Sequence, residues 1–99
     1  MKQELFNQSL EACVKNRVNV WIRGSWTDVM DALEQAGDER FVIYHLRDDN
    51  AHYGQTVIHM FANRGTGKPC LVIDSLTRPL LGSHPIDAVT RDKFYFLSL

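Results

Sequence analysis

The sequence predicts an α+β domain in which two N-terminal helices cover a roughly five-stranded, mainly antiparallel sheet. Two observations lead to this fold class. The segments with helical periodicity come early in the chain, and the segments with strand character come mostly late and one after another. We therefore expect the element order α-β-α-β-β-β-β, with both helices on one side of the sheet.

All of the chain, residues 1–99, is expected to form a single domain. Hydrophobic residues at 44% and charged residues at 23% are ordinary globular values, which excludes a disordered, collagen-like or coiled-coil chain. A chain of this length buries about 65% of its extended surface on folding, so the core needs no disulfide bonds.

Two segments have the periodicity of amphipathic helices. Between residues 3 and 16, apolar side chains recur at steps of three and four residues, which places them on one stripe of a helix. A second helix is expected to begin after Ser25, because Ser25 and Asp28 have the spacing of a capping box. Gly37 stands where the left-handed residue that ends a helix is usually found. The apolar stripes are Leu5, Phe6, Leu10, Cys13 and Val14 in the first helix and Val29, Met30, Leu33 and Ala36 in the second.

Five segments are expected to be strands, over residues 18–22, 40–46, 53–62, 70–75 and 93–97. Residues 40–46 are apolar on both faces, so we place this strand in the centre of the sheet. Residues 63–69 have turn composition, which predicts that the strands on either side pair as an antiparallel hairpin. Residues 86–91 are expected to form one helical turn before the last strand.

The charge and the cysteine content limit the cell compartments and the kinds of partner that we expect for this protein. Eleven Lys and Arg against twelve Asp and Glu leave a net charge of −1, whereas a nucleic-acid binder usually carries a basic surplus on one face. Residues 1–5 enter an amphipathic pattern without the apolar stretch of a signal peptide, and no segment has the length of a membrane span. We therefore expect a cytoplasmic protein that binds neither nucleic acid nor a membrane. Cys13 and Cys70 lie far apart without a CxxC spacing, which favours two reduced thiols.

Neither the glycines nor the histidines form a cofactor or metal motif. The run from Gly65 to Lys68 lacks two parts of a phosphate-binding loop, since Ala62 replaces the earlier glycine and Pro69 replaces the hydroxyl residue. The histidines are His45, His52, His59 and His84. No pair of them has metal-ligand spacing with a third ligand nearby, so we expect no metal and no cofactor.

A histidine and an aspartate on two neighbouring predicted strands indicate one route to catalysis. His52 starts the strand over 53–62, and Asp74 lies near the end of the strand over 70–75, so antiparallel pairing would let the carboxylate fix the imidazole tautomer. This arrangement resembles the C-terminal half of papain-like and protein-glutaminase-type cysteine hydrolases, where a histidine strand precedes a strand ending in an aspartate and a proline-bearing loop. The resemblance covers about half of the chain and implies His52 as the base, Asp74 as its orienting partner and residues 76–80 as the loop.

The nucleophile of such enzymes is a cysteine at the N-terminus of the central helix, where the helix dipole and the histidine lower the thiol pKa. In this chain that position holds Ser25 and Trp26. Cys13 is the remaining candidate, although it is also explained as a small buried hydrophobic residue. One hypothesis is therefore a cysteine-dependent acyl-transfer enzyme, a peptidase or glutamine deamidase, in which Cys13 attacks, His52 moves the proton and Asp74 holds the ring.

A cluster of Trp21, Arg23 and Trp26 supports a different hypothesis, because Trp and Arg dominate protein-binding hot spots. The alternative interpretation is that Trp21 covers the second face of the sheet and Trp26 packs at the start of the second helix. Since the chain lacks a complete catalytic set, we favour binding of another protein, as an inhibitor, immunity factor or adaptor. The exposed face of the sheet, or an edge strand such as 18–22 or 94–97, is the expected contact surface, and the same edge serves equally for a homodimer.

Overall fold

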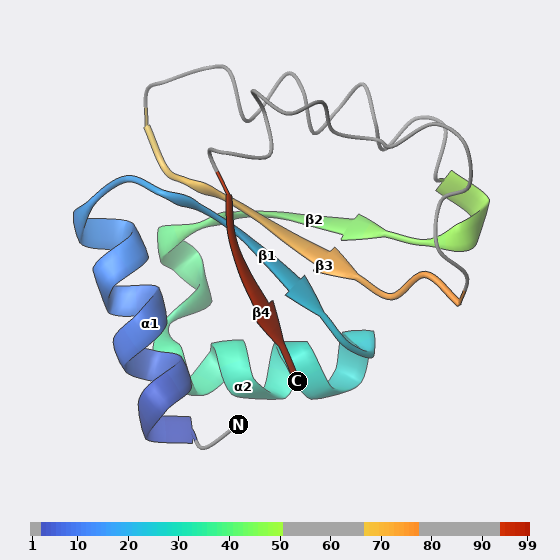
Figure 1. The fold of residues 1–99 in the computed structure, drawn as a ribbon, viewed down its shortest axis with the longest axis horizontal. Helices are drawn as coiled ribbons and strands as arrows, with labels where there is room; N and C mark the ends of the chain where they lie inside the picture. Colours follow the sequence, from blue (N-terminus) through green and yellow to red (C-terminus); the bar gives the residue numbers. More distant parts are fainter. Residues whose placement is uncertain (1–2, 51–66, 78–93) are drawn as a thin grey trace.

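Two α-helices and four β-strands make up the part of the chain that this computed structural model describes, residues 3–50, 67–77 and 94–99 (Figure 1). The elements are α1 (Gln3–Lys15), β1 (Asn19–Arg23), α2 (Trp26–Ala36), the 3-10 turn η1 (Asp38–Arg40), β2 (Val42–Leu46), the 3-10 turn η2 (Asp48–Asn50), β3 (Cys70–Asp74) and β4 (Phe94–Ser98). The predicted α+β composition with two helices is confirmed.

The sheet is parallel, and the predicted mainly antiparallel five-stranded sheet is wrong. Its four strands have the order β2-β3-β1-β4, and every neighbouring pair runs parallel. Both sides of β3 are occupied by parallel strands, which leaves no side for the antiparallel partner expected over 53–62. The strand expected over 53–62 and the helical turn expected over 86–91 lie outside the described residues.

Burial on both faces explains why β1 and β3 form the centre of this sheet. All five residues of β3 are buried, as are the three middle residues of β1. Strands of parallel sheets are normally continuous apolar runs, because each face is covered. The predicted central position of residues 40–46 and the predicted edge position of 18–22 are therefore both wrong. Within the described sheet, β2 and β4 lie at the two edges.

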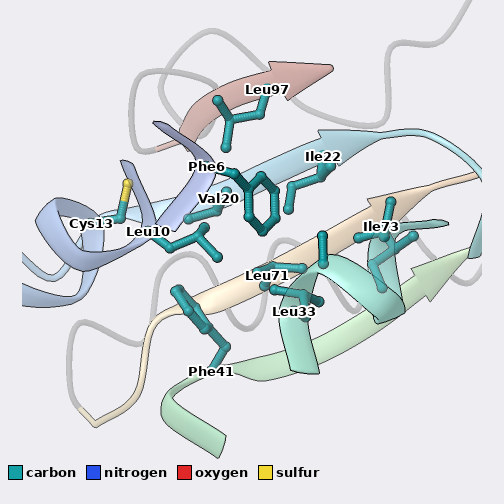
Figure 2. Close-up of a cluster of buried hydrophobic side chains, with 12 residues drawn as sticks. Phe6, Leu10, Cys13, Val20, Ile22, Leu33, Phe41, Leu71, Ile73 and Leu97 are labelled. Carbon is teal, nitrogen blue, oxygen red and sulfur yellow. The ribbon is translucent and has the colours of Figure 1, made fainter. Parts of the chain in front are cut away.

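One core lies between the helices and the sheet, as Figure 2 shows. It is lined by every second residue of the central strands, among them Val20 and Ile22 from β1 and Leu71 and Ile73 from β3. The helices contribute Phe6, Leu10, Cys13, Val29, Ala32 and Leu33 to the same cluster. Both helices therefore cover one face of the sheet, as the sequence predicts.

The opposite face of the sheet carries a second apolar cluster built around Trp21. This side chain is 7% exposed and makes an edge contact with Phe94 at 5.7 Å and a tilted contact with Phe96 at 5.8 Å between ring centroids. The other buried members are Leu46, Cys70, Val72 and Leu76. Aromatic pairs at these separations add about 0.5–1.5 kcal/mol beyond the burial of their area.

The ends of α2 form as the sequence predicts. Ser25 has extended backbone angles, and its hydroxyl accepts a hydrogen bond from the Asp28 amide at 3.2 Å. Gly37 has a φ of 95°, and its amide donates to the Leu33 carbonyl at 2.8 Å. Because β1 ends at Arg23 and α2 begins at Trp26, the first turn of α2 lies directly beside the carboxyl end of β1.

Helix α1 ends on a left-handed residue that is not glycine. Arg17 has a φ of 55°, its amide donates to the Val14 carbonyl at 3.2 Å, and the Val18 amide donates to the Cys13 carbonyl at 2.8 Å. These two hydrogen bonds define a Schellman motif, whose left-handed position is most often glycine because a Cβ atom is disfavoured there.

Arg17→Gly is therefore expected to raise the free energy of unfolding by about 0.5–1 kcal/mol, since the relieved backbone strain exceeds the added flexibility of the unfolded chain. Urea unfolding followed by circular dichroism measures the change. Lys15→Gly, two residues earlier and inside the helix, is the matched control and should lower stability by about 1 kcal/mol. Equal effects of the two substitutions would contradict the assignment of strain to Arg17.

Candidate functional site

The carboxyl ends of β1, β2 and β3 meet at one edge of the sheet, because the three strands run parallel. The register places Arg23 opposite Asp74, and Asp74 opposite Leu46. An open pocket of about 340 Å³ lies at this edge, between the ends of β1 and β3 and the start of α2. Ligands of parallel sheets usually bind outside the carboxyl ends of the strands. This pocket is therefore the candidate functional site.

A buried carboxylate, Asp74, organises the floor of the pocket. Asp74 is 6% exposed, and one of its oxygens, Oδ2, accepts hydrogen bonds from Trp21 Nε1 at 3.0 Å and Arg23 Nη1 at 3.3 Å. The other oxygen, Oδ1, accepts from the Leu76 amide at 3.1 Å. The Arg23 side chain is 54% exposed, so its charge both offsets the buried carboxylate and faces the pocket. Asp74 is thus fully engaged in holding the ends of β1 and β3 together.

A histidine and a serine lie beside this carboxylate on the ends of β2 and β3. His45 Nε2 is 2.5 Å from Ser75 Oγ, and the Trp26 ring stacks on the imidazole with 4.4 Å between centroids. Burial lowers the pKa of His45 from 6.5, and the positive charge of Arg47 lowers it further, while Asp49 acts weakly in the opposite direction. The imidazole is therefore neutral at neutral pH.

Main-chain and side-chain hydrogen bonds hold the histidine and serine in place. The Ser75 amide donates to the Leu46 carbonyl at 3.1 Å, and Asn50 Nδ2 donates to the His45 carbonyl at 2.7 Å. The Asp48 carboxylate accepts from the amide and the hydroxyl of Thr77 at 3.1 and 2.6 Å. These hydrogen bonds therefore join the segment that follows β3 to the end of β2 and to the segment that follows it.

The structure brings Trp21, Arg23 and Trp26 to this one edge, but it exposes them unequally. Trp26 is 41% exposed and Arg23 is about half exposed, whereas Trp21 is buried with its indole N–H bonded to Asp74. Trp21 covers the second face of the sheet, as its alternative interpretation states. Only Arg23 and Trp26 are therefore accessible to a partner at this edge.

The residues of the cysteine-hydrolase hypothesis do not come together in the described part of the chain. Cys13 lies in the core on the helix-covered face, and burial raises the pKa of its thiol above the ordinary 9.0. Asp74 contacts Trp21, whose side chain belongs to the opposite face, so the sheet separates the two groups. His52 lies outside the described residues.

A second accessible feature is the outer edge of β4. Tyr95 is 46% and Phe96 is 51% exposed, although both are aromatic. Tyr95 pairs in register with Val20 and faces the helices, while Phe96 pairs with Trp21 and faces the other side. A groove of about 390 Å³ lies between α1 and Tyr95, and the residues that line it carry no charge. This edge is thus apolar on both faces.

His45 and Ser75 are functional candidates that the sequence analysis missed. A histidine inside an apolar strand and a serine just after another strand were visible as residue types. Their proximity depends on the parallel pairing of β2 with β3, whereas the sequence analysis expected a mainly antiparallel sheet. A prediction of parallel strands from the apolar run at 70–73 would have brought the two residues together.

Comparisons with protein-family models, with curated proteins and with solved structures find no match for this chain. Among the described residues, neither helix is long and apolar enough to cross a membrane. The same described residues contain no group of three or more histidine, cysteine, aspartate or glutamate side chains that could hold a metal ion. The function therefore has to be argued from the site and the surface alone.

Asp74→Ala is expected to lower the free energy of unfolding by about 2–3 kcal/mol, because the buried Trp21 indole and the Leu76 amide both lose their acceptor. Trp21→Phe removes one donor and is expected to cost about 1–2 kcal/mol. Urea unfolding measures both. Asp49→Ala is the matched control, since that carboxylate is 75% exposed in its pair with Arg47, and it should change stability by less than about 0.5 kcal/mol. A cost for Asp74→Ala as small as that of the control would show that the buried carboxylate does not hold the two strands.

Both cysteines should react slowly in the folded protein. Burial raises the pKa of Cys13, and it raises the pKa of Cys70 to about 12, so little thiolate is present at about pH 8. Iodoacetamide labelling followed by intact mass measurement tests this, with the urea-unfolded chain as the control that labels twice. Rapid modification of Cys13 in the native protein would instead restore the hypothesis of a cysteine nucleophile.

Proposed function

We propose that the protein acts by binding another protein chain at the outer edge of β4, and that this chain is a second copy of the same protein. The observation that carries the proposal is the apolar, uncharged edge formed by residues 94–99. A strand at the edge of a sheet presents unpaired backbone groups that pair readily with another strand. Natural edges usually block such pairing with charges or prolines, and this edge has neither.

The direction of the backbone groups supports strand addition. The Leu99 amide donates inward to the Arg23 carbonyl at 3.0 Å. Backbone groups of successive residues alternate between the two sides of a strand, so the amides of Phe96 and Ser98 point away from β1. Within the described residues, no strand pairs with this outer side of β4. With the amide of Phe94, which follows the same alternation, the edge therefore offers three donors in line for an added strand.

The chemistry of the edge favours a second copy as the occupant. Two β4 strands that pair antiparallel about a twofold axis bring no like charges together, because residues 94–99 are uncharged in each copy. The added strand would cover Tyr95 on one face and Phe96 on the other. The uncharged groove beside α1 can take an apolar side chain of that strand. An inhibitor, immunity-factor or adaptor role would use the same edge against a different chain.

Ser98→Pro is the substitution that tests this surface. It removes an outward-pointing donor and leaves the inward hydrogen bonds of β4 to β1 in place, because proline is tolerated where an edge N–H faces away from the sheet. We expect the wild-type protein to have the mass of a dimer in light scattering at several concentrations, and Ser98→Pro to have the mass of a monomer with an unchanged circular dichroism spectrum.

Ser98→Ala is the matched control, since it shortens the same exposed side chain and keeps the amide, and it should remain dimeric. A wild-type protein that is monomeric at every concentration would contradict self-pairing. A dimer that survives Ser98→Pro would show that the two copies meet at a surface other than β4.

A further inference from the structure

The contact between His45 and Ser75 is built by the register of the sheet. In the pairing of β2 with β3, His45 lies opposite Ile73, and Ser75 follows Ile73 by two residues, so Ser75 is the diagonal neighbour of His45 on the same face of the sheet. The 2.5 Å separation of Nε2 and Oγ is a short hydrogen bond between a hydroxyl and an imidazole. Hydrogen bonds to the Ser75 amide and to the His45 carbonyl fix the backbone of both residues, and the Trp26 ring packs on the imidazole.

The direction of this hydrogen bond follows from the chemistry of the two groups. The Ser75 hydroxyl has one proton, and it lies 2.5 Å from His45 Nε2 but 3.3 Å from the Leu46 carbonyl. A neutral imidazole has one nitrogen that accepts. Because the pKa of His45 is lowered, the ring is neutral at neutral pH, and in its Nδ1-protonated tautomer Nε2 accepts from the Ser75 hydroxyl. This is the arrangement of a serine and its general base.

The serine of the pair is accessible to a small molecule. Ser75 lines the open pocket of about 340 Å³, together with Arg23 and Trp26. Trp26 stacks on the imidazole and offers an apolar wall, while the half-exposed Arg23 guanidinium, paired with Asp74, offers polar N–H groups to the same pocket.

We propose that Ser75 is a nucleophile, that His45 is its general base, and that the pocket takes small carboxylic esters. Ser75 Oγ attacks the ester carbonyl carbon while its proton moves to His45 Nε2. The bond from the carbonyl carbon to the alcohol oxygen breaks, and the alcohol leaves with that proton. Water then attacks the acyl-serine, gives its proton to His45, and releases the carboxylic acid while Ser75 recovers its hydrogen. The substrate ester and water supply every atom of the two products, the alcohol and the carboxylic acid.

Covalent labelling of the full chain with a small alkyl fluorophosphonate tests the proposal. Ser75 attacks phosphorus and fluoride leaves, so intact mass and peptide mapping identify the modified serine. We expect Ser75 to be labelled in the wild-type protein, and labelling to fall at least about 100-fold in His45→Gln, which cannot accept the proton. Ser75→Ala should abolish it. Ser9→Ala, which changes a partly exposed serine on α1, is the control that should label as the wild type does.

The pH dependence separates a catalytic pair from a structural contact. The labelling rate should rise with pH as His45 loses its proton and then level off, with the midpoint of the rise below the ordinary pH 6.5, because the pKa of His45 is lowered. The same variants should hydrolyse p-nitrophenyl acetate in the same order. Labelling of Ser75 no faster than Ser9, or labelling unaffected by His45→Gln in a variant that keeps the wild-type circular dichroism spectrum, would overturn the proposal.

Discussion

The position of β1 between two parallel strands is the constraint on which the rest of the structure depends. β1 pairs with β3 and β4, which lie far along the chain, and its side chains supply the centre of both apolar clusters. Parallel pairing also forces all carboxyl ends to one edge. The pocket, the buried carboxylate and the His45–Ser75 pair exist at that edge because the strands share a direction.

The buried Asp74 is the clearest electrostatic consequence of this arrangement. A carboxylate out of water is costly unless each of its oxygens has partners. Here the neighbouring strand supplies an indole N–H and a guanidinium, and the chain just beyond β3 supplies an amide. The same Trp21 that fills the second face of the sheet thus satisfies the charge at its edge, which couples packing on that face to the geometry of the pocket.

The sequence predicts the local elements of this fold better than their arrangement. The spacing of Ser25 and Asp28 and the position of Gly37 locate α2, because capping depends on neighbouring residues. The direction of strand pairing depends on contacts between residues about 50 apart, such as Trp21 and Val72, and turn composition at 63–69 suggested the wrong partner. Because the direction of strand pairing was predicted wrongly, the sequence analysis paired His52 with Asp74 and did not consider His45 together with Ser75.

The pocket and the β4 edge meet at Gly24. A side chain there would come within 3.2 Å of Val29 Cγ2 and 3.4 Å of Leu99 Cβ, so the missing Cβ lets the end of β4 close against the turn from β1 to α2. Gly24 also lines the pocket. A change at Gly24 would therefore disturb both surfaces together, whereas Ser98 belongs only to the edge and Ser75 only to the pocket. The proposed strand addition and the proposed ester cleavage therefore belong to two surfaces that share one turn and can be tested separately.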